Sequence, residues 1–235
     1  MIRVAVAGAA GRMGETVCAA VEGAEDMELV ARVDPLLGTT LEDVLMGSHP
    51  PEVVVDFTQP DTALANALSC VRAGVHVVIG TTGFDPAPLS RARPADGKPN
   101  ANVLIAPNFA IGAILMMRFA QEAAKHMAKA EIIERHHDQK LDAPSGTAAR
   151  TAELMAAATG DGSGPAHPGG IPIHSVRLPG LVADQEVIFG DIGQTLSIRH
   201  DTIGRESFMP GVLLAIRRVG SLEQSPLVGL EHLLF

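Results

Sequence analysis

A glycine-rich turn near the N-terminus constrains the fold of this chain more than any other feature. The segment Gly8-Ala9-Ala10-Gly11-Arg12-Met13-Gly14 follows a run of β-branched and small residues, 2–7, and precedes a helical stretch that continues to about residue 22. The first glycine permits a tight turn, the second lets the backbone approach a pyrophosphate, and the third lets helix and strand pack closely. The order strand, turn, helix predicts a dinucleotide site, although an ordinary βα turn has the same order.

An acidic residue follows at the spacing that such a site requires. Asp34 ends the second predicted strand, residues 28–33, and a carboxylate there would accept the ribose hydroxyls and repel a 2′-phosphate. The next residue is Pro35 rather than an arginine that could bind the phosphate. The sequence therefore favours NADH, and NADPH stays open because Arg12 could compensate. In the alternative interpretation Asp34 only caps a loop.

The rest of the N-terminal half alternates strands with helices. A helix is predicted over residues 61–73, and apolar runs predict strands at 53–57, 75–79 and 103–106. Continuous apolar strands in this order predict an α/β fold with a Rossmann-type parallel sheet that is covered on both faces. Ligands of such sheets lie at the carboxyl edge. Two turns there are candidates for cofactor contact, with plain loops as the alternative: Gly80-Thr81-Thr82 and Ala106-Pro107-Asn108-Phe109.

The pattern changes after Pro107 and predicts a second α/β domain on a mixed, largely open sheet. Its predicted helices cover residues 110–127 and 143–158, and its predicted strands cover 130–135, 173–178, 186–190 and 195–200. Residues 159–170 are dense in Gly, Pro and Ser, which predicts a loop. A final helix, 208–219, is expected to return to the first domain. We therefore expect a dinucleotide-binding domain of residues 1–106 plus 208–235, and a substrate-binding and oligomerisation domain of residues 107–207.

Composition narrows the possible ligands. The formal net charge is −9, and the chain has no Trp or Tyr, which argues against nucleic acid as a partner. No apolar run is long enough to span a membrane, and the chain enters a strand at Ile2, so we expect no membrane association and a cytoplasmic location. Cys18 and Cys70 are expected to be buried and reduced. An anionic ligand would require a local positive cluster.

Residues 135–147 supply that cluster. The run Arg135-His136-His137-Asp138-Gln139-Lys140 follows a predicted strand, and Ser145-Gly146-Thr147 reads as the capped start of a helix. Helix N-termini bind carboxylates, and histidine donates protons near neutral pH. The adjacent histidines are not spaced as zinc ligands, so no metal is expected. The cluster predicts a site for a small substrate with more than one carboxylate, and an exposed polar loop is the alternative.

At this point the chain resembles the 4-hydroxy-tetrahydrodipicolinate reductase (dihydrodipicolinate reductase) family, in the compact form typical of actinobacteria. The resemblance rests on the glycine turn and on the segments 55–58, 80–84, 106–109, 134–147 and 208–213. It implies reduction of a cyclic dicarboxylate with a conjugated imine by NAD(P)H in lysine and diaminopimelate biosynthesis. It also implies that His136 and Lys140 are catalytic, and that substrate is held by His137, Gly146 and Thr147. The residues implied to bind the cofactor are Gly8, Ala9, Ala10, Gly11, Arg12, Met13, Asp34, Gly80, Thr81, Thr82, Ala106, Pro107, Asn108 and Phe109.

The resemblance also implies a homotetramer formed through the second domain. One position departs from the family pattern, because Gln139, preceded by Asp138, stands where a third histidine is usual. Asp138 could draw Lys140 away from substrate. Two other functions remain as alternatives: a nucleotide sensor without turnover, which the glycine turn fits equally well, and a semialdehyde-type dehydrogenase, which would need Cys18 or Cys70 as a nucleophile.

Overall fold

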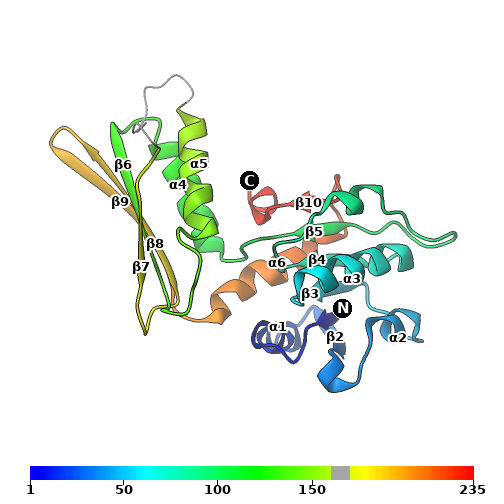
Figure 1. Ribbon diagram of the computed structural model, residues 1–235. Coiled ribbons are helices and arrows are strands. Elements are labelled where there is room, and N and C mark those ends of the chain that lie inside the picture. Colours follow the sequence, from blue (N-terminus) through cyan, green and yellow to red (C-terminus); the bar gives the residue numbers. More distant parts are fainter. Residues whose placement is uncertain (160–169) are drawn as a thin grey trace. The chain divides into compact units, whose positions relative to one another are not determined.

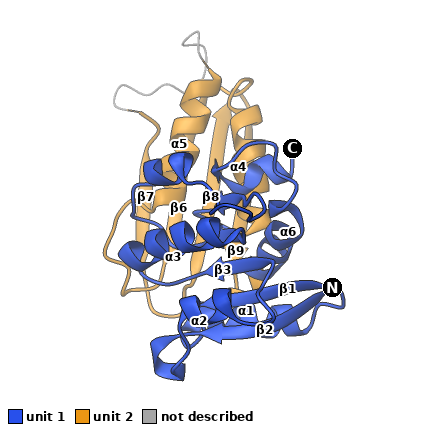
Figure 2. Ribbon diagram, turned by 90° about the vertical axis from the view of Figure 1, so that its right-hand side faces the viewer, with its two compact units in different colours: residues 1–109, 208–235 blue, residues 110–207 orange. Residues whose placement is uncertain are grey.

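The computed structural model describes residues 1–159 and 170–235, and these divide into two compact units (Figure 2). Unit 1 comprises Met1–Phe109 and Phe208–Phe235, and unit 2 comprises Ala110–Ser207. The sequence placed the first boundary slightly earlier, after residue 106. Residues 107–109 belong to unit 1 because Phe109 is buried there, with its ring centroid 5.8 Å from that of Phe57. Most of the loop predicted over residues 159–170 lies outside the described residues.

Unit 1 is built on a parallel sheet whose strand order is β10-β5-β4-β3-β1-β2. The strands are β1 (Ile2–Ala7), β2 (Met27–Val33), β3 (Val53–Asp56), β4 (His76–Ile79), β5 (Val103–Ile105) and β10 (Leu227–Val228). The strands β1, β3, β4 and β5 are buried along most or all of their length, as expected for apolar strands covered on both faces. The predicted Rossmann-type parallel sheet is confirmed.

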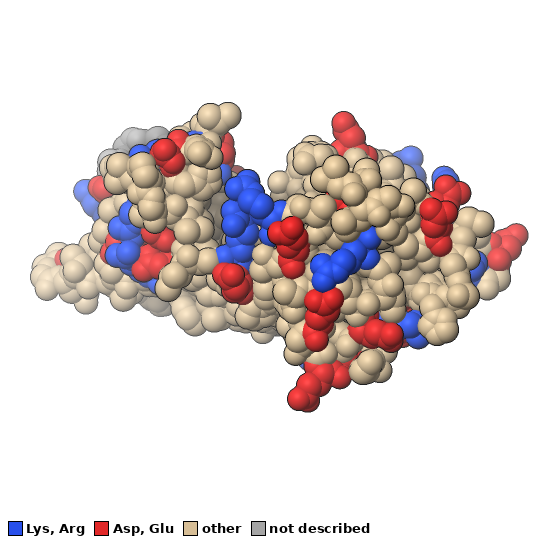
Figure 3. All heavy atoms as spheres, turned by 90° about the horizontal axis from the view of Figure 1, so that it is seen from below, with Lys and Arg blue, Asp and Glu red and all other residues tan. Residues whose placement is uncertain are grey.

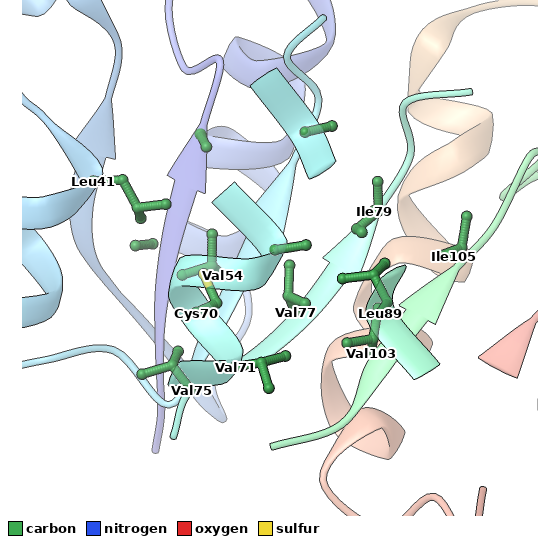
Figure 4. Close-up of a cluster of buried hydrophobic side chains, with 14 of the residues drawn as sticks. Leu41, Val54, Cys70, Val71, Val75, Val77, Ile79, Leu89, Val103 and Ile105 are labelled. Atoms are coloured by element: carbon green, nitrogen blue, oxygen red, sulfur yellow. The ribbon is translucent and has the colours of Figure 1, made fainter. Parts of the chain in front are cut away.

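Helices cover both faces of this sheet. Helices α1 (Arg12–Glu22) and α6 (Met209–Val219) contact each other and one face, while α2 (Leu41–Met46) and α3 (Pro60–Ala73) lie over the other. Under α2 and α3 the buried side chains form one apolar cluster, to which Leu41, Val54, Cys70 and Ile79 belong (Figure 4). The core therefore holds the strand ends, and the turns that leave them, in fixed positions.

Unit 2 has a four-stranded mixed sheet of order β7-β6-β8-β9. The strands β6 (Lys129–His136) and β7 (Ile173–Arg177) pair in parallel, and β8 (Ala183–Asp191) pairs antiparallel with both β6 and β9 (Gln194–Thr202). Both long helices, α4 (Ile111–Ala123) and α5 (Gly146–Ala158), lie on the same side of this sheet (Figure 1). The predicted mixed sheet is confirmed.

The ends of two helices differ from the predicted ends because of local backbone hydrogen bonds and conformation. Helix α4 ends at Ala123 rather than near residue 127, because the N–H groups of Lys125 and His126 bond to carbonyls three residues back. Helix α5 begins at Gly146, as the predicted Ser145 cap requires, and the predicted helical stretch that started at residue 143 is three residues too long at this end, because Ser145 is extended. The described residues also include short 3-10 helices at Pro35–Leu37, Ala87–Arg91, Arg205–Phe208 and Leu230–Leu233.

Two further observations concern the surface. In the described part of the chain, no helix is long and apolar enough to cross a membrane. On the face drawn in Figure 3, acidic and basic side chains lie interspersed over the parts of the chain that it shows.

Candidate functional site

Four turns of unit 1 leave the carboxyl ends of β1, β3, β4 and β5. Because these strands are parallel, their carboxyl ends share one edge of the sheet, where α/β proteins bind dinucleotides. Apart from Asp34, the cofactor residues expected from sequence lie directly after β1, β4 and β5, in the turns that leave these strands or, for Arg12 and Met13, at the start of α1. The turn after β3 was not assigned a role from the sequence.

The glycine turn has the close approaches that a phosphate cradle needs. Gly8 has a φ of 79°, and a Cβ placed there would lie 2.8 Å from the carbonyl oxygen of Phe57. A Cβ on Gly14 would lie 2.0 Å from the carbonyl oxygen of Gly8. Helix α1 starts after Gly11 without a side-chain cap, so its first N–H groups point out of the helix end. These features fit the phosphates of a dinucleotide.

Asp34, which directly follows β2, also holds the glycine turn. Its Oδ2 accepts the N–H of Ala10 at 3.1 Å, and its Oδ1 accepts the N–H of Leu36 at 2.9 Å. The alternative interpretation, that Asp34 caps a loop, therefore describes a real contact. A carboxylate accepts about four hydrogen bonds, so two acceptor positions remain for ribose hydroxyls. The two interpretations are compatible.

The turn after β3 contacts both the turn after β4 and the turn after β5. The Phe57 ring occupies the space beside Gly80, where a Cβ would lie 2.1 Å from Cε1, and it also contacts the Phe109 ring. The hydroxyl of Thr81 donates to the carbonyl of Thr58 at 2.9 Å. Sequence reasoning had assigned no role to Phe57 or Thr58, although their position directly after a buried strand was a usable signal.

A buried carboxylate fixes the start of this turn. Asp56 is fully buried at the end of β3; its Oδ1 accepts the backbone N–H and the hydroxyl of Thr58, and its Oδ2 accepts the amide of Asn66 at 2.8 Å. Asp56 therefore holds Thr58 in place, and Thr58 in turn holds Thr81.

The residues of unit 2 that the sequence marked as catalytic or substrate-binding lie close to the end of β6. His136 is the last residue of β6 and half-buried, whereas His137, the next residue, is exposed. Lys140 lies in the following turn, with its N–H bonded to the carbonyl of His137 at 3.2 Å and its side chain 22% exposed. The strand end thus separates the two histidines, as their adjacency in an extended segment requires.

Beneath His136 lies a buried ion pair that sequence reasoning missed. Glu134 is fully buried, and its two carboxylate oxygens accept from Arg177 Nη1 and Nη2 at 2.8 and 2.7 Å. Its Oε2 also contacts the Nδ1 of His136, and its Oε1 accepts the N–H of Ser145 at 3.2 Å. The only signal for Arg177 in the sequence was its position at the end of a predicted strand.

These contacts set the charge states. Burial alone would raise the pKa of Glu134, but hydrogen bonds from Arg177, Ser175 and His136 outweigh burial and hold that pKa at about 2. Burial lowers the pKa of His136, with smaller contributions from the charges of Lys140 and Arg177, and Glu134 opposes this only in part. At neutral pH, Glu134 is ionised and His136 is neutral.

The helix start that follows is a ready anion site. Ser145 caps α5 as predicted, with its hydroxyl oxygen accepting the N–H of Ala148 at 3.2 Å. The N–H groups of Gly146 and Thr147 have no partner within the helix, and the space beside Gly146 is open. Because Glu134 contacts both His136 and Ser145, this helix start lies beside the end of β6.

Lys140 is paired, but not with the residue that the sequence suggested. Its Nζ donates to both carboxylate oxygens of Asp142 at 2.7 Å, and this hydrogen bonding lowers the pKa of Asp142. Asp138 and Gln139 are exposed. A substrate carboxylate would thus compete with Asp142, not Asp138, for Lys140.

Other chemistries find little support in the described residues. No group of three or more His, Cys, Asp and Glu within residues 1–159 and 170–235 is placed to hold a metal ion. Cys18 and Cys70 are free and buried in α1 and α3, as predicted. Burial raises the pKa of both thiols, so neither offers a thiolate to a substrate.

Comparison with known proteins places both units in one family. Residues 2–109 match the family described as "Dihydrodipicolinate reductase, N-terminus", and residues 112–234 match "Dihydrodipicolinate reductase, C-terminus". The chain is 51% identical to 4-hydroxy-tetrahydrodipicolinate reductase of Thermobifida fusca, over 100% of the chain and 99% of that relative. It is also 51% identical to the protein of that name from Mycolicibacterium smegmatis, over 99% of each chain.

A solved structure is similar over the same length. Dihydrodipicolinate reductase from Paenisporosarcina sp. TG-14, in a dipicolinate-bound form, is 38% identical with a TM-score of 0.79, and the match covers 99% of each chain.

Proposed function

This chain belongs to the dihydrodipicolinate reductase family, and on that premise we propose that it reduces 4-hydroxy-tetrahydrodipicolinate, or its dehydrated form, to tetrahydrodipicolinate. The reaction is a step of lysine and diaminopimelate biosynthesis and uses NAD(P)H. The supporting relatives cover the whole chain, so the proposal concerns the entire protein rather than one domain.

One observation supports a specific mechanism for this reaction. The carboxylate of Glu134 contacts the His136 ring and the backbone N–H of Ser145, and so joins a titratable group to a helix N-terminus that binds carboxylates. Lys140 lies in the turn that separates them. A nucleotide sensor without turnover has no need of this arrangement.

The side chains of unit 2 then have separate roles. His136 donates a proton to the reduced substrate, with Lys140 as a second candidate donor that also binds charge. The N–H groups of Gly146 and Thr147 hold one substrate carboxylate, and His137, which is exposed, approaches a carboxylate from the turn. Lys140 exchanges its contact with Asp142 for one with substrate.

In unit 1 the residues fit a nicotinamide dinucleotide. We assign the phosphates to Gly8, Ala9, Ala10, Gly11, Arg12 and Met13, and the nicotinamide end to Gly80, Thr81, Thr82, Ala106, Pro107, Asn108 and Phe109. When bound, NAD(P)H supplies the hydride. The free acceptor positions of Asp34 favour a ribose 2′-hydroxyl over a 2′-phosphate, so we propose NADH as the preferred cofactor, used in the cytoplasm.

We also infer a homotetramer formed through the sheet of unit 2. The residues of β6 and β8 that alternate with the buried Ile132 and Val187 face away from the helices, and they include the half-buried Ile133 and Ile188. Sedimentation analysis tests this directly. Ile133→Glu should reduce the tetramer to smaller species, and a monomeric wild-type protein would contradict the assembly.

The proposed function has a direct test. Purified protein should oxidise NADH only when substrate is generated in situ, followed by the loss of absorbance of the reduced nicotinamide. Binding of NADH without consumption in the presence of substrate would overturn the proposal and favour a sensor.

A further inference from the structure

The contacts of Glu134 distinguish it from the other acidic residues of unit 2. It lies two residues before His136 on the same face of β6, and it is fully buried. Two guanidinium N–H groups, one backbone N–H and one imidazole nitrogen contact its two oxygens, and the side chain of Ser175 also hydrogen-bonds to this carboxylate. Buried ion pairs add little net stability compared with apolar residues, so stability alone does not explain this pair.

The charge of Glu134 decides which nitrogen of His136 carries a hydrogen. An ionised carboxylate only accepts hydrogen bonds. The contact between Glu134 Oε2 and His136 Nδ1 therefore requires a hydrogen on Nδ1. In a neutral imidazole the other nitrogen, Nε2, then has no hydrogen and is an acceptor.

We propose that Glu134, clamped by Arg177 and by the N–H of Ser145, is a positioning residue that holds His136 in its Nδ1–H form, so that Nε2 is the nitrogen that exchanges the proton with substrate. This inference rests on the proposed role of His136 as proton donor. Neutral His136 first takes one proton from solvent at Nε2. The Nε2–H bond then breaks as that proton passes to the anion left by hydride addition, and the Nδ1–H imidazole is regenerated.

Arg177 extends the same positioning to Lys140. Its Nη2 also donates to the carbonyl of Asp142 at 2.7 Å, and Asp142 is the residue that holds the Lys140 ammonium. The charged groups around His136 are therefore Glu134 on its own strand, Arg177 on β7, and Lys140 with Asp142 in the turn before α5. A dianionic substrate adds negative charge there, which favours protonation of His136 when substrate binds.

The wild-type protein provides the first test. Nitrogen-15 NMR of the histidine rings distinguishes Nδ1–H from Nε2–H forms, and the His136 signals are identified by their loss in His136→Gln. We expect His136 in the Nδ1–H form. His174 on the same sheet is the internal contrast, because its Nε2, not its Nδ1, contacts a carboxylate, Glu131, at 2.8 Å. An Nε2–H form of neutral His136 would overturn the proposal, whether or not the protein reduces its proposed substrate.

A pair of matched variants provides the second test. Glu134→Gln keeps the shape but removes the charge, so the pKa of His136 by NMR, and the alkaline limb of the kcat/KM profile, should move down by about one pH unit or more. The control is Glu131→Gln on the same strand, which should leave both unchanged. An unmoved His136 pKa in Glu134→Gln would overturn the proposal.

If Glu134→Gln does not fold because Arg177 is left unpaired, Glu134→Gln with Arg177→Met removes both charges. The pKa of His136 should still fall there, because Glu134 contacts the ring directly. An unchanged or raised pKa would contradict the role given to Glu134. Failure of substrate turnover by wild type would instead contradict the proposed function and leave the tautomer measurement interpretable.

Discussion

The guanidinium of Arg177 donates to both carboxylate oxygens of Glu134, although the two residues lie 43 positions apart in the sequence. The parallel register of β6 and β7 brings them together, since Glu134 pairs with Ser175 and His136 pairs with Arg177. The end of β6 that carries His136 is therefore supported by a contact with a strand that follows only after helix α5 in the sequence.

Acid should destabilise the protein through this contact. The pKa of Glu134 is about 2 in the folded chain against 4.5 ordinarily, so its contribution is complete above pH 4.5 and is lost as pH falls toward 2. That difference corresponds to about 3 kcal/mol. Urea unfolding at several pH values should show a smaller loss across this window in Glu134→Gln than in wild type. Glu122→Gln, which removes an exposed ion pair with Lys125, is the control. Equal acid sensitivity in wild type and Glu134→Gln would contradict this prediction.

Lys140→Met should lower kcat/KM by about 100-fold or more, because it removes both a candidate proton donor and a charge that binds substrate. Steady-state kinetics with substrate generated in situ measure this. Lys125→Met is a matched control, since Lys125 also pairs with a nearby carboxylate but lies just after the end of α4 and outside residues 134–147. Wild-type kinetics in Lys140→Met would remove Lys140 from the mechanism.

Asp34→Ala should raise the ratio of kcat/KM for NADPH to that for NADH, because the repulsion of a 2′-phosphate disappears. The substitution also removes two hydrogen bonds that hold the turn, so Asp34→Asn, which keeps an acceptor, separates charge from local order. Both variants should shift the ratio in the same direction. Glu28→Ala, an exposed position in strand β2, which Asp34 follows, should leave the ratio unchanged. A constant ratio would mean that Asp34 does not read the ribose.

Gly14→Ala should disrupt the dinucleotide turn, because the new Cβ would lie 2.0 Å from the carbonyl oxygen of Gly8. The atom that the new Cβ meets belongs to the backbone and cannot move without distorting the turn, and overpacking of this kind costs about 1–3 kcal/mol. We expect a lower free energy of unfolding. We also expect NADH binding, measured by titration calorimetry, to be at least about tenfold weaker, because a cost of this size in the binding turn reduces the affinity by that factor. At the other end of α1, Gly23→Ala meets only ordinary contact at 3.4 Å and should bind NADH normally. Tight NADH binding by Gly14→Ala would show that the turn does not need this close approach.

Much of this protein was determined by local sequence. Apolar strands, the glycine turn and the Ser145 cap depend on neighbouring residues, so their periodicity and composition were enough to predict the parallel sheet of unit 1 and the start of α5. Strand β10 and helix α2 were missed because each is short and carries a weak pattern.

What tertiary structure alone decided is which distant residues meet. The sequence marked His136 and Lys140, but strand pairing and packing determined that Glu134 and Arg177 support His136, that Asp142 rather than Asp138 holds Lys140, and that Phe57 joins two cofactor turns. Local propensity specifies an element and its end. Register between strands, and burial of a charge with its partners, arise only when separate elements pack together, and these set the charge of the proposed proton donor.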